Sequence, residues 1–181
     1  MALDFATHWN ELAPAVRAWC ALQVRGPLGN AFDADDLEQE VCFQALRAFD
    51  GYDPALGSLR GWLFGVASKV AQHALRGLAR ARANAGPVEP LASRVDTLPA
   101  ALTTISRRVR RDEALEHLLE AVSGLEELDR RIVVYRGLEG LSHEEVGQLL
   151  GLTTEAAKKR WQRALERLRQ APTIAGLFVD D

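Results

Sequence analysis

The chain has 181 residues, of which 48% are hydrophobic and 26% are charged, and its formal net charge is −3 at pH 7. This composition fits an ordinary globular protein of one or two small domains. The negative net charge excludes a polycation that coats nucleic acid without a specific site, so any surface for an anionic partner must come from basic residues gathered locally.

Three helices are predicted in the first part of the chain, and no strand pattern is found in the sequence. The first has apolar residues at steps of four and three, which mark one helical face: Phe5, Trp9, Leu12, Val16 and Trp19. It should end before the turn-rich residues 25–30, and a second helix should begin at the acidic residues 33–36, since carboxylates favour the positive end of the helix dipole. After a loop over 50–58 that contains Gly, Pro and Asp, Ser58 can cap a third helix over 59–83.

The prolines mark a domain boundary. Residues 84–100 contain three prolines and little periodicity, which is typical of a linker. We therefore predict an all-α protein of two small helical domains. The first covers residues 1–83, a Pro-containing linker follows over 84–105, the second domain covers 106–170, and a tail over 171–181 ends the chain.

Two further helices are predicted ahead of the most basic part of the chain. The first begins near residues 104–106 and has an apolar face made of Val109, Leu115, Leu118, Leu119 and Val122. The second carries Leu125, Leu128, Ile132, Val133 and Tyr135. These spacings are those of amphipathic helices that bury one side.

A helix-turn-helix is predicted near the C-terminal end. Ser142 is a good N-cap, and Glu145 three residues later completes a capping box, so a helix should start at His143. Its apolar face should consist of Val146, Leu149 and Leu150. Gly151 should end this helix in the left-handed conformation that only glycine adopts cheaply, and Gly147 lies where two crossing helices leave no room for a side chain.

The second helix of this motif is the most basic segment of the chain. Thr153 or Thr154 can cap it, and it should run from about Glu155 to about Arg169. Its buried stripe should consist of Ala157, Trp161, Ala164, Leu165 and Leu168. The candidate duplex-DNA site combines the two threonines with long donors suited to phosphates and base edges: Thr153, Thr154, Lys158, Lys159, Arg160, Gln162, Arg163 and Arg167. For any single one of them a solvated basic face is the alternative, but the whole motif favours DNA recognition.

Other features of the sequence exclude several classes of site. Cys20 and Cys42 lie in apolar helical patterns without a CxxC partner or a histidine at ligand spacing, so we expect buried reduced thiols and neither a metal site nor another cofactor. No apolar run approaches the roughly 20 residues that cross a bilayer, and residues 1–12 lack the features of a secretion signal, which predicts a cytoplasmic protein without membrane insertion. No phosphate-binding glycine loop and no nucleophile with a credible base is found, which argues against an enzyme.

The first predicted domain contains ADDLEQEVCFQALRAFDGYDP, followed by GSLRGWLFGVASKVAQHALR. These segments resemble region 2 of the extracytoplasmic-function (ECF) group of sigma-70 family sigma factors of bacterial RNA polymerase. The second domain resembles region 4 through LEELDRRIVVYRGLEGLSHEEVGQLLGLTTEAAKKRWQRALERLR. Together the blocks cover essentially residues 3–170. They imply an alternative sigma factor that binds core RNA polymerase and promoter DNA at the −10 and −35 elements, with an anti-sigma factor as a further possible partner.

The resemblance also implies three binding surfaces. The second helix would dock on a basic coiled coil of the largest polymerase subunit through Asp35, Asp36, Glu38, Gln39 and Glu40. The loop and the third helix would capture flipped bases of the −10 element and hold the single strand through Tyr52, Asp53, Ser58, Lys69, Arg76, Arg80 and Arg82. The basic helix of the second domain would read the −35 element through the donors named above.

Some of these residues have a structural alternative. Asp35 and Asp36 could serve only as caps of their helix. Trp62 and Phe64 could stack on bases, but Trp62 also fits an apolar stripe, and we expect it in the core. The acidic residues of the docking helix, Glu38 included, are expected to be exposed, so that reversing their charge would leave the fold intact.

A different function is possible for the same motifs. A polymerase-independent helix-turn-helix regulator could bind duplex DNA and use the N-terminal helices for dimerisation or sensing. Such a protein would bind a palindromic site as a dimer. The acidic residues 33–40 and the aromatic, basic third helix argue against it, since a dimerisation helix needs neither. Co-purification with polymerase would separate the two functions.

Overall fold

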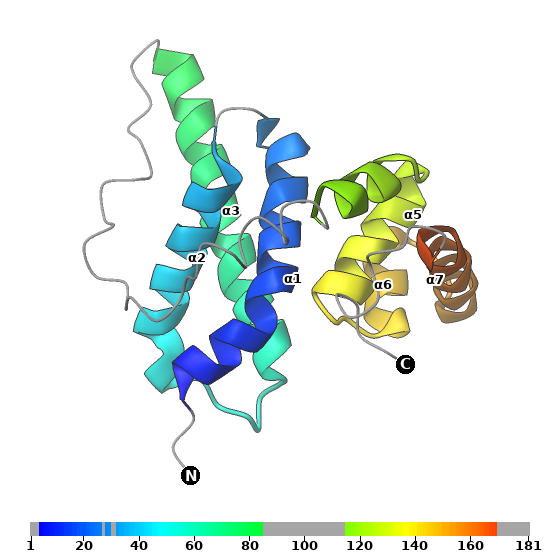
Figure 1. Cartoon of the computed structure of the whole chain (residues 1–181), viewed down its shortest axis with the longest axis horizontal. Helices are drawn as coiled ribbons and strands as arrows, with labels where there is room; N and C mark the ends of the chain where they lie inside the picture. Colours follow the sequence, from blue (N-terminus) through cyan, green and yellow to red (C-terminus); the bar gives the residue numbers. More distant parts are fainter. Residues whose placement is uncertain (1–3, 27, 30–31, 85–114, 170–181) are drawn as a thin grey trace. The chain divides into compact units, whose positions relative to one another are not determined.

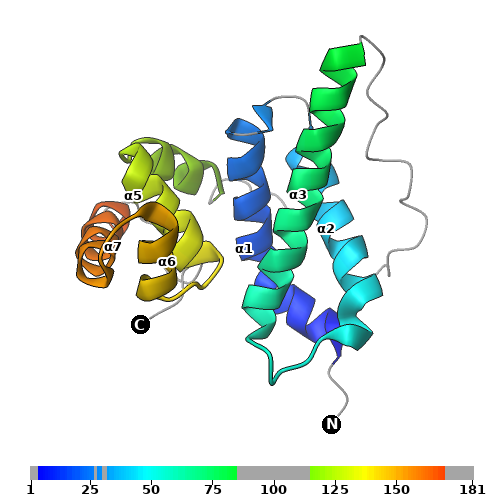
Figure 2. The same cartoon turned by 180° about the vertical axis from the view of Figure 1, so that it is seen from behind.

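The structure, a computed structural model, describes residues 4–26, 28–29, 32–84 and 115–169, with residues 81–84 described by their backbone alone. The chain divides into two compact units, Met1–Leu102 and Thr103–Asp181, each with its own core. Figure 1 and Figure 2 show the helices from opposite sides. Throughout the described ranges every regular element is helical, which confirms the predicted all-α class. The predicted linker, apart from its first residue, and the predicted tail lie outside these ranges.

Three long helices make up the first unit: α1 (Phe5–Arg25), α2 (Ala34–Ala48) and α3 (Leu59–Asn84), with a 3-10 turn η2 (Phe49–Gly51) directly after α2. The helices lie side by side, and α2 packs against both α1 and α3 (Figure 1). Side chains at the centre of this bundle are almost completely buried: Val16, Leu28, Leu37, Val41 and Phe64. The three helices predicted for this part of the chain are confirmed.

Side-chain caps set the starts of α2 and α3. The Asp33 carboxylate accepts a hydrogen bond from the backbone N–H of Asp35 at 2.7 Å, and the Ser58 hydroxyl accepts one from the backbone N–H of Gly61 at 3.1 Å. Such caps satisfy backbone donors that have no partner inside the helix. The acidic start of α2 and the serine cap of α3 are therefore as predicted.

Both cysteines are buried free thiols. Burial raises the pKa of Cys42 to about 12 and the pKa of Cys20 well above its usual value, and the Glu38 carboxylate acts in the same direction. Both thiols therefore stay protonated at neutral pH, which makes them poor nucleophiles. In the described part of the chain no group of three His, Cys, Asp or Glu side chains could hold a metal ion, and no helix there is long and apolar enough to cross a membrane.

The second unit contains a helix over residues 115–123, then α5 (Glu127–Ile132), the π-helical segment η5 (Val133–Leu138), α6 (His143–Leu150) and α7 (Thr154–Arg169). α7 packs against both α5 and α6 (Figure 2). The core of this unit is formed by Leu118, Leu119, Val122, Ile132, Val133, Leu138, Val146, Trp161 and Leu168. The two helices predicted before the motif are confirmed from residue 115 onward, but the change to π-helix at Val133 is a feature that apolar spacing does not predict.

The local geometry of the helix-turn-helix follows the prediction. Ser142 and Glu145 form a capping box, with the Glu145 side chain accepting from Ser142 N–H at 2.7 Å and the Ser142 hydroxyl accepting from Glu145 N–H at 3.2 Å. These bonds lower the pKa of Glu145. Gly151 ends α6 with φ +67°, in the left-handed region that favours glycine. The Thr153 hydroxyl accepts from the backbone N–H of Ala156 at 3.2 Å and thereby caps α7, which starts at Thr154, one residue earlier than predicted.

One expected core residue of α6 is not buried. Val146 and Gly147 are buried, and Leu150 is half-buried, but the Leu149 side chain is 58% exposed. Because Gly147 itself faces the core, the buried face is centred on Val146, Gly147 and Leu150, and Leu149 lies to one side of it. The predicted place of Leu149 in the apolar face is therefore wrong. On α7 the predicted stripe is confirmed, with Ala157, Trp161, Ala164 and Leu168 buried and Leu165 half-buried.

Candidate functional site

The acidic residues of α2 differ in their surroundings. Arg17 of α1 donates from Nε to Glu38 at 2.9 Å and from Nη2 to Asp35 at 3.2 Å, and its side chain is only 11% exposed. Glu38 is itself 18% exposed, so the expectation that it is a freely exposed charge is wrong. The physical reason is that a nearly buried arginine needs a carboxylate partner. Glu38 therefore helps to join α1 to α2.

The remaining polar residues of the predicted docking surface are Asp36, Gln39 and Glu40, all half-buried at the start of α2. The Glu40 carboxylate accepts a hydrogen bond from the Gln44 side chain at 2.7 Å, one turn further along the same helix. The exposed Asp35 carboxylate, although it contacts Arg17, keeps 57% of its side-chain surface open. Carboxylate and amide groups therefore do reach the surface here, where they can meet a basic partner.

The loop between α2 and α3 is held by its own hydrogen bonds. The Tyr52 hydroxyl donates to the carbonyl of Gly57 at 3.0 Å, and the Asp53 carboxylate accepts from Ala55 N–H at 2.9 Å. Ser58 is used as the cap of α3. At the tip of the loop the Leu56 side chain is 87% exposed. The hydrogen bonds of Tyr52, Asp53 and Ser58 therefore fix the conformation of the loop, and the tip of the loop is exposed to solvent.

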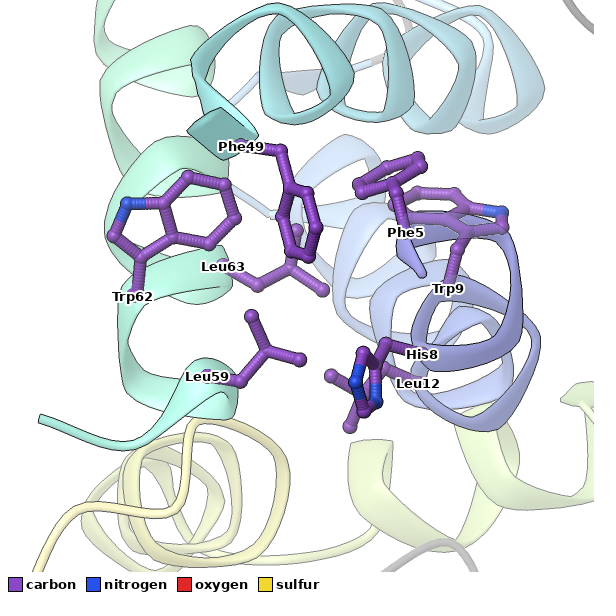
Figure 3. A pocket seen from close by; sticks show the side chains of 8 residues that line it. All are labelled: Phe5, His8, Trp9, Leu12, Phe49, Leu59, Trp62 and Leu63. Atoms are coloured by element: carbon purple, nitrogen blue, oxygen red, sulfur yellow. The ribbon is translucent and has the colours of Figure 1, made fainter. Parts of the chain in front are cut away.

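Aromatic rings pack together where this loop joins α2 and α3. Tyr52 lies 5.5 Å from the Trp62 ring, and Phe49 contacts both rings at 6.3 Å and 6.1 Å. Phe5 at the start of α1 meets Phe49 edge-on at 5.2 Å. Figure 3 shows the Phe5, Phe49 and Trp62 rings beside a small apolar pocket, which is lined by Phe5, His8, Trp9, Leu12, Phe49, Leu59, Trp62 and Leu63. The ring cluster ties the loop to α1 and α3.

Two aromatic residues of α3 were considered as partners for unpaired bases. Phe64 is only 2% exposed and packs edge-on against Trp19 at 6.2 Å, so it is a core residue and cannot stack on DNA. Trp62 is half-buried in the ring cluster rather than fully inside the core. Its predicted core position is thus only partly right.

Three basic residues of α3 occupy one exposed face, whereas Arg60 near the start of the helix is half-buried, with its guanidinium over the Phe64 ring. Lys69, Arg76 and Arg80 are all exposed, and their separations of seven and four residues place them in one row along the helix. The opposite side carries the buried Ala67, Ala71, Ala74 and Leu78. The row can therefore track an anionic strand while the other face stays in the core. The side chain of Arg82 lies outside the described residues.

The basic residues of α7 separate into two groups. Lys158, Lys159, Gln162 and Arg163 are exposed, and Thr154 is the exposed first residue of the helix. Arg163 also donates from Nε to the carbonyl of Lys159 at 3.4 Å. Lys159 and Arg163 lie opposite the buried Trp161, and Lys158 and Gln162 lie on the flank away from Arg160; these four side chains are called the outer face of the helix.

Arg160 and Arg167 form the second group and face α5. Arg160 donates from Nη1 to Asp129 at 2.7 Å, and Glu126 lies 3.7 Å from the same nitrogen. Arg167 Nη1 is 3.9 Å from the other oxygen of Asp129. The hydrogen bond to Asp129 is the main cause that raises the pKa of Arg160. Asp129 was not among the predicted site residues, although its place on a helical face with Leu125 and Ile132 is a sequence signal for a buried carboxylate.

Both units match known families. Residues 9–81 match the family model of Sigma-70 region 2, and residues 115–168 match that of Sigma-70, region 4. The chain is 34% identical over 167 residues to the RNA polymerase sigma factor CarQ of Myxococcus xanthus, with 92% of this chain and 85% of the relative covered. It is 30% identical over 172 residues to the ECF RNA polymerase sigma factor SigD of Mycobacterium tuberculosis, with 94% of this chain and 77% of the relative covered.

A solved structure with a similar chain is the sigma factor RpoE of Bartonella quintana, crystallised with the anti-sigma factor NepR. The identity is 22% and the TM-score is 0.47, with 95% of this chain and 98% of that chain covered.

The family matches also decide between the two functions that the sequence allowed. A polymerase-independent regulator is not favoured, because the N-terminal helices match Sigma-70 region 2. Sigma factors are regulatory initiation factors rather than catalysts. The chain therefore belongs to the ECF group of the sigma-70 family, and it is an alternative sigma factor that directs transcription initiation by RNA polymerase.

Proposed function

We propose that the three surfaces described above divide the work of a sigma factor. The acidic start of α2 docks on core polymerase, the loop over 52–58 with the basic row of α3 holds the single-stranded −10 element, and the outer face of α7 reads the −35 element. The observation that carries the proposal, in a chain of net charge −3, is that each unit has a row of exposed cations on one helix, opposite its buried stripe: Lys69, Arg76 and Arg80 on α3, and Lys159 and Arg163 on α7. Such rows suit the phosphates of nucleic acid.

Three further properties are predicted for the chain. The chain should have no catalytic activity of its own and should act in the cytoplasm, where its polymerase and promoters are. An anti-sigma factor remains a predicted partner. A search for a protein that co-purifies with the chain and lowers its binding to core polymerase would identify such a factor.

The docking surface can be tested by reversing its charges. The variant Asp36→Lys/Glu40→Lys should bind core polymerase much more weakly than the wild type, because two carboxylates that face a basic partner are replaced by cations. A matched control is Glu11→Lys/Asp50→Lys, which makes the same change of charge at exposed sites outside α2. Pull-down of core polymerase should show loss with the first variant and retention with the second. Equal binding by both variants would remove α2 as the docking helix.

The role of α3 can be tested in promoter opening. Lys69→Ala/Arg76→Ala should slow the opening of the −10 element more than it weakens closed-complex binding, since these cations are proposed to hold the separated strand. Permanganate reactivity of promoter thymines, followed over time, measures the opening. The charge-preserving variant Lys69→Arg/Arg76→Lys should open the promoter close to the wild-type rate. Unchanged opening in the alanine variant would argue against this assignment.

A further inference from the structure

Asp129 stands apart from the other acidic residues of this protein because it is buried. Within the described ranges it is the one charged residue in the buried class, and its side chain is 8% exposed. Its neighbours on the same face of the second unit, Leu125 and Ile132, are also buried. An ionised carboxylate in such a place is costly unless it is paired and hydrogen-bonded. The groups that pair with it are therefore fixed in place.

Those groups come from α7, the helix proposed to read DNA. Arg160 contacts Oδ1 of Asp129 at 2.7 Å, a short distance typical of a charge-assisted hydrogen bond, and Arg167 lies 3.9 Å from Oδ2. The two arginines are seven residues apart, so they share one row of the helix. Glu126 adds a second carboxylate 3.7 Å from Arg160. Two cations and two anions thus compensate each other along this flank of α7.

This flank is distinct from the outer face of α7. At about 100° per residue, Lys159 and Arg163 point roughly 160° away from the buried Trp161, and Lys158 and Gln162 lie about 60° and 100° from it on the side of the helix opposite to Arg160. Lys159 and Arg163 therefore face solvent, while Arg160 turns toward α5. A guanidinium that already has a hydrogen-bonded carboxylate partner gains little by contacting a phosphate or a guanine edge.

We propose that Asp129 is a positioning residue for promoter recognition, because it holds Arg160 against α5 and removes it from the set of DNA contacts. This inference rests on the proposed function of α7. The −35 element is then read chiefly by the exposed Lys158, Lys159, Gln162 and Arg163. Arg160 contributes neither to base preference nor to the salt dependence of binding, although the helix-turn-helix pattern predicts it as a DNA contact.

The test replaces the ion pair by an uncharged pair, so that the local charge stays balanced. Promoter binding by holoenzyme with the variant Asp129→Asn/Arg160→Gln is measured over a range of salt concentrations, with Arg163→Gln as the matched control. Each phosphate contact contributes about 0.9 to the slope of log K against log salt. The uncharged pair should leave the slope unchanged. Arg163→Gln should make it shallower by about one contact and relax the preference at one −35 base.

A slope that falls as much with the uncharged pair as with Arg163→Gln would overturn the inference, because Arg160 would then contact DNA. Melting curves establish that the variants are folded. If the Asn/Gln pair does not fold, Asp129→Leu/Arg160→Leu serves in its place, since buried ion pairs are often replaced by apolar residues without loss of stability. A wild-type holoenzyme that binds promoters equally well with and without a −35 element would instead overturn the proposed function of α7, and this inference with it.

Discussion

Replacing Trp161 with alanine should unfold the helix-turn-helix unit at temperatures where the first unit remains folded. The Trp161 side chain is fully buried in the stripe that packs α7 against α5 and α6. An alanine at this position would leave most of the volume of the indole ring empty. Truncation of a buried aromatic side chain costs about 3–5 kcal/mol, which is a large part of the stability of a small domain. Thermal melting of the full chain, followed by circular dichroism, should show an early transition that the wild type lacks.

The control for this change lies next to it in the sequence. Gln162 is exposed on the same helix, and Gln162→Ala should alter the free energy of unfolding by no more than about 0.5 kcal/mol. If Trp161→Ala were fully stable but had lost DNA binding, the assignment of the inner and outer faces of α7 would be wrong.

Gly147→Val should destabilise the same unit because α6 approaches the turn too closely for a side chain. A Cβ at this position would stand 2.8 Å from the carbonyl oxygen of Leu152 and 3.5 Å from backbone atoms of Thr153 and Thr154. These are backbone atoms of the turn and of the start of α7, so they cannot move aside like the end of a flexible side chain. We expect a loss of about 1–3 kcal/mol, larger than the gain of up to about 1 kcal/mol from replacing a helical glycine.

Gly77→Ala separates the effect of the steric clash from the effect of helix propensity. Gly77 is exposed in α3 and a Cβ there would meet nothing within 4 Å, so alanine should stabilise the first unit by up to about 1 kcal/mol. Trp161 is the only tryptophan of residues 103–181, so its indole N–H resonance reports the folding of the second unit in the Gly147 variant. A Gly147→Val chain with an unshifted Trp161 resonance and wild-type stability would show that the turn tolerates a side chain.

The parts of the fold that sequence predicted well depend on local interactions. Ser142, Gly151 and Ser58 mark helix ends through hydrogen bonds or backbone conformations that involve only a few neighbouring residues. The buried stripe of α7 follows from helical periodicity alone, which is why the burial of Trp161 could be expected. Leu149 is the one residue of the motif whose burial was predicted wrongly. The spacing of Val146, Leu149 and Leu150 does not reveal that a glycine shares the buried face.

The missed features are contacts between residues far apart in the chain. Arg17 reaches Glu38 across 21 positions, and Arg160 reaches Asp129 across 31. Composition and spacing identify these four residues as charged, but they do not tell whether a charge faces solvent or a partner within the protein. For this reason the sequence predicted too many exposed carboxylates on α2 and too many cations on α7 that are accessible to DNA.

The most direct test of the proposed function is transcription by core RNA polymerase, with and without this chain, on a library of promoter fragments. Sequencing of the transcript starts should reveal transcripts that depend on the chain and share two conserved elements upstream, at about the spacing of −10 and −35 sites. The Asp36→Lys/Glu40→Lys variant should yield far fewer of these transcripts than the Glu11→Lys/Asp50→Lys control. The contradictory result is a chain that gives core polymerase no new start sites and instead binds a palindromic duplex by itself as a dimer.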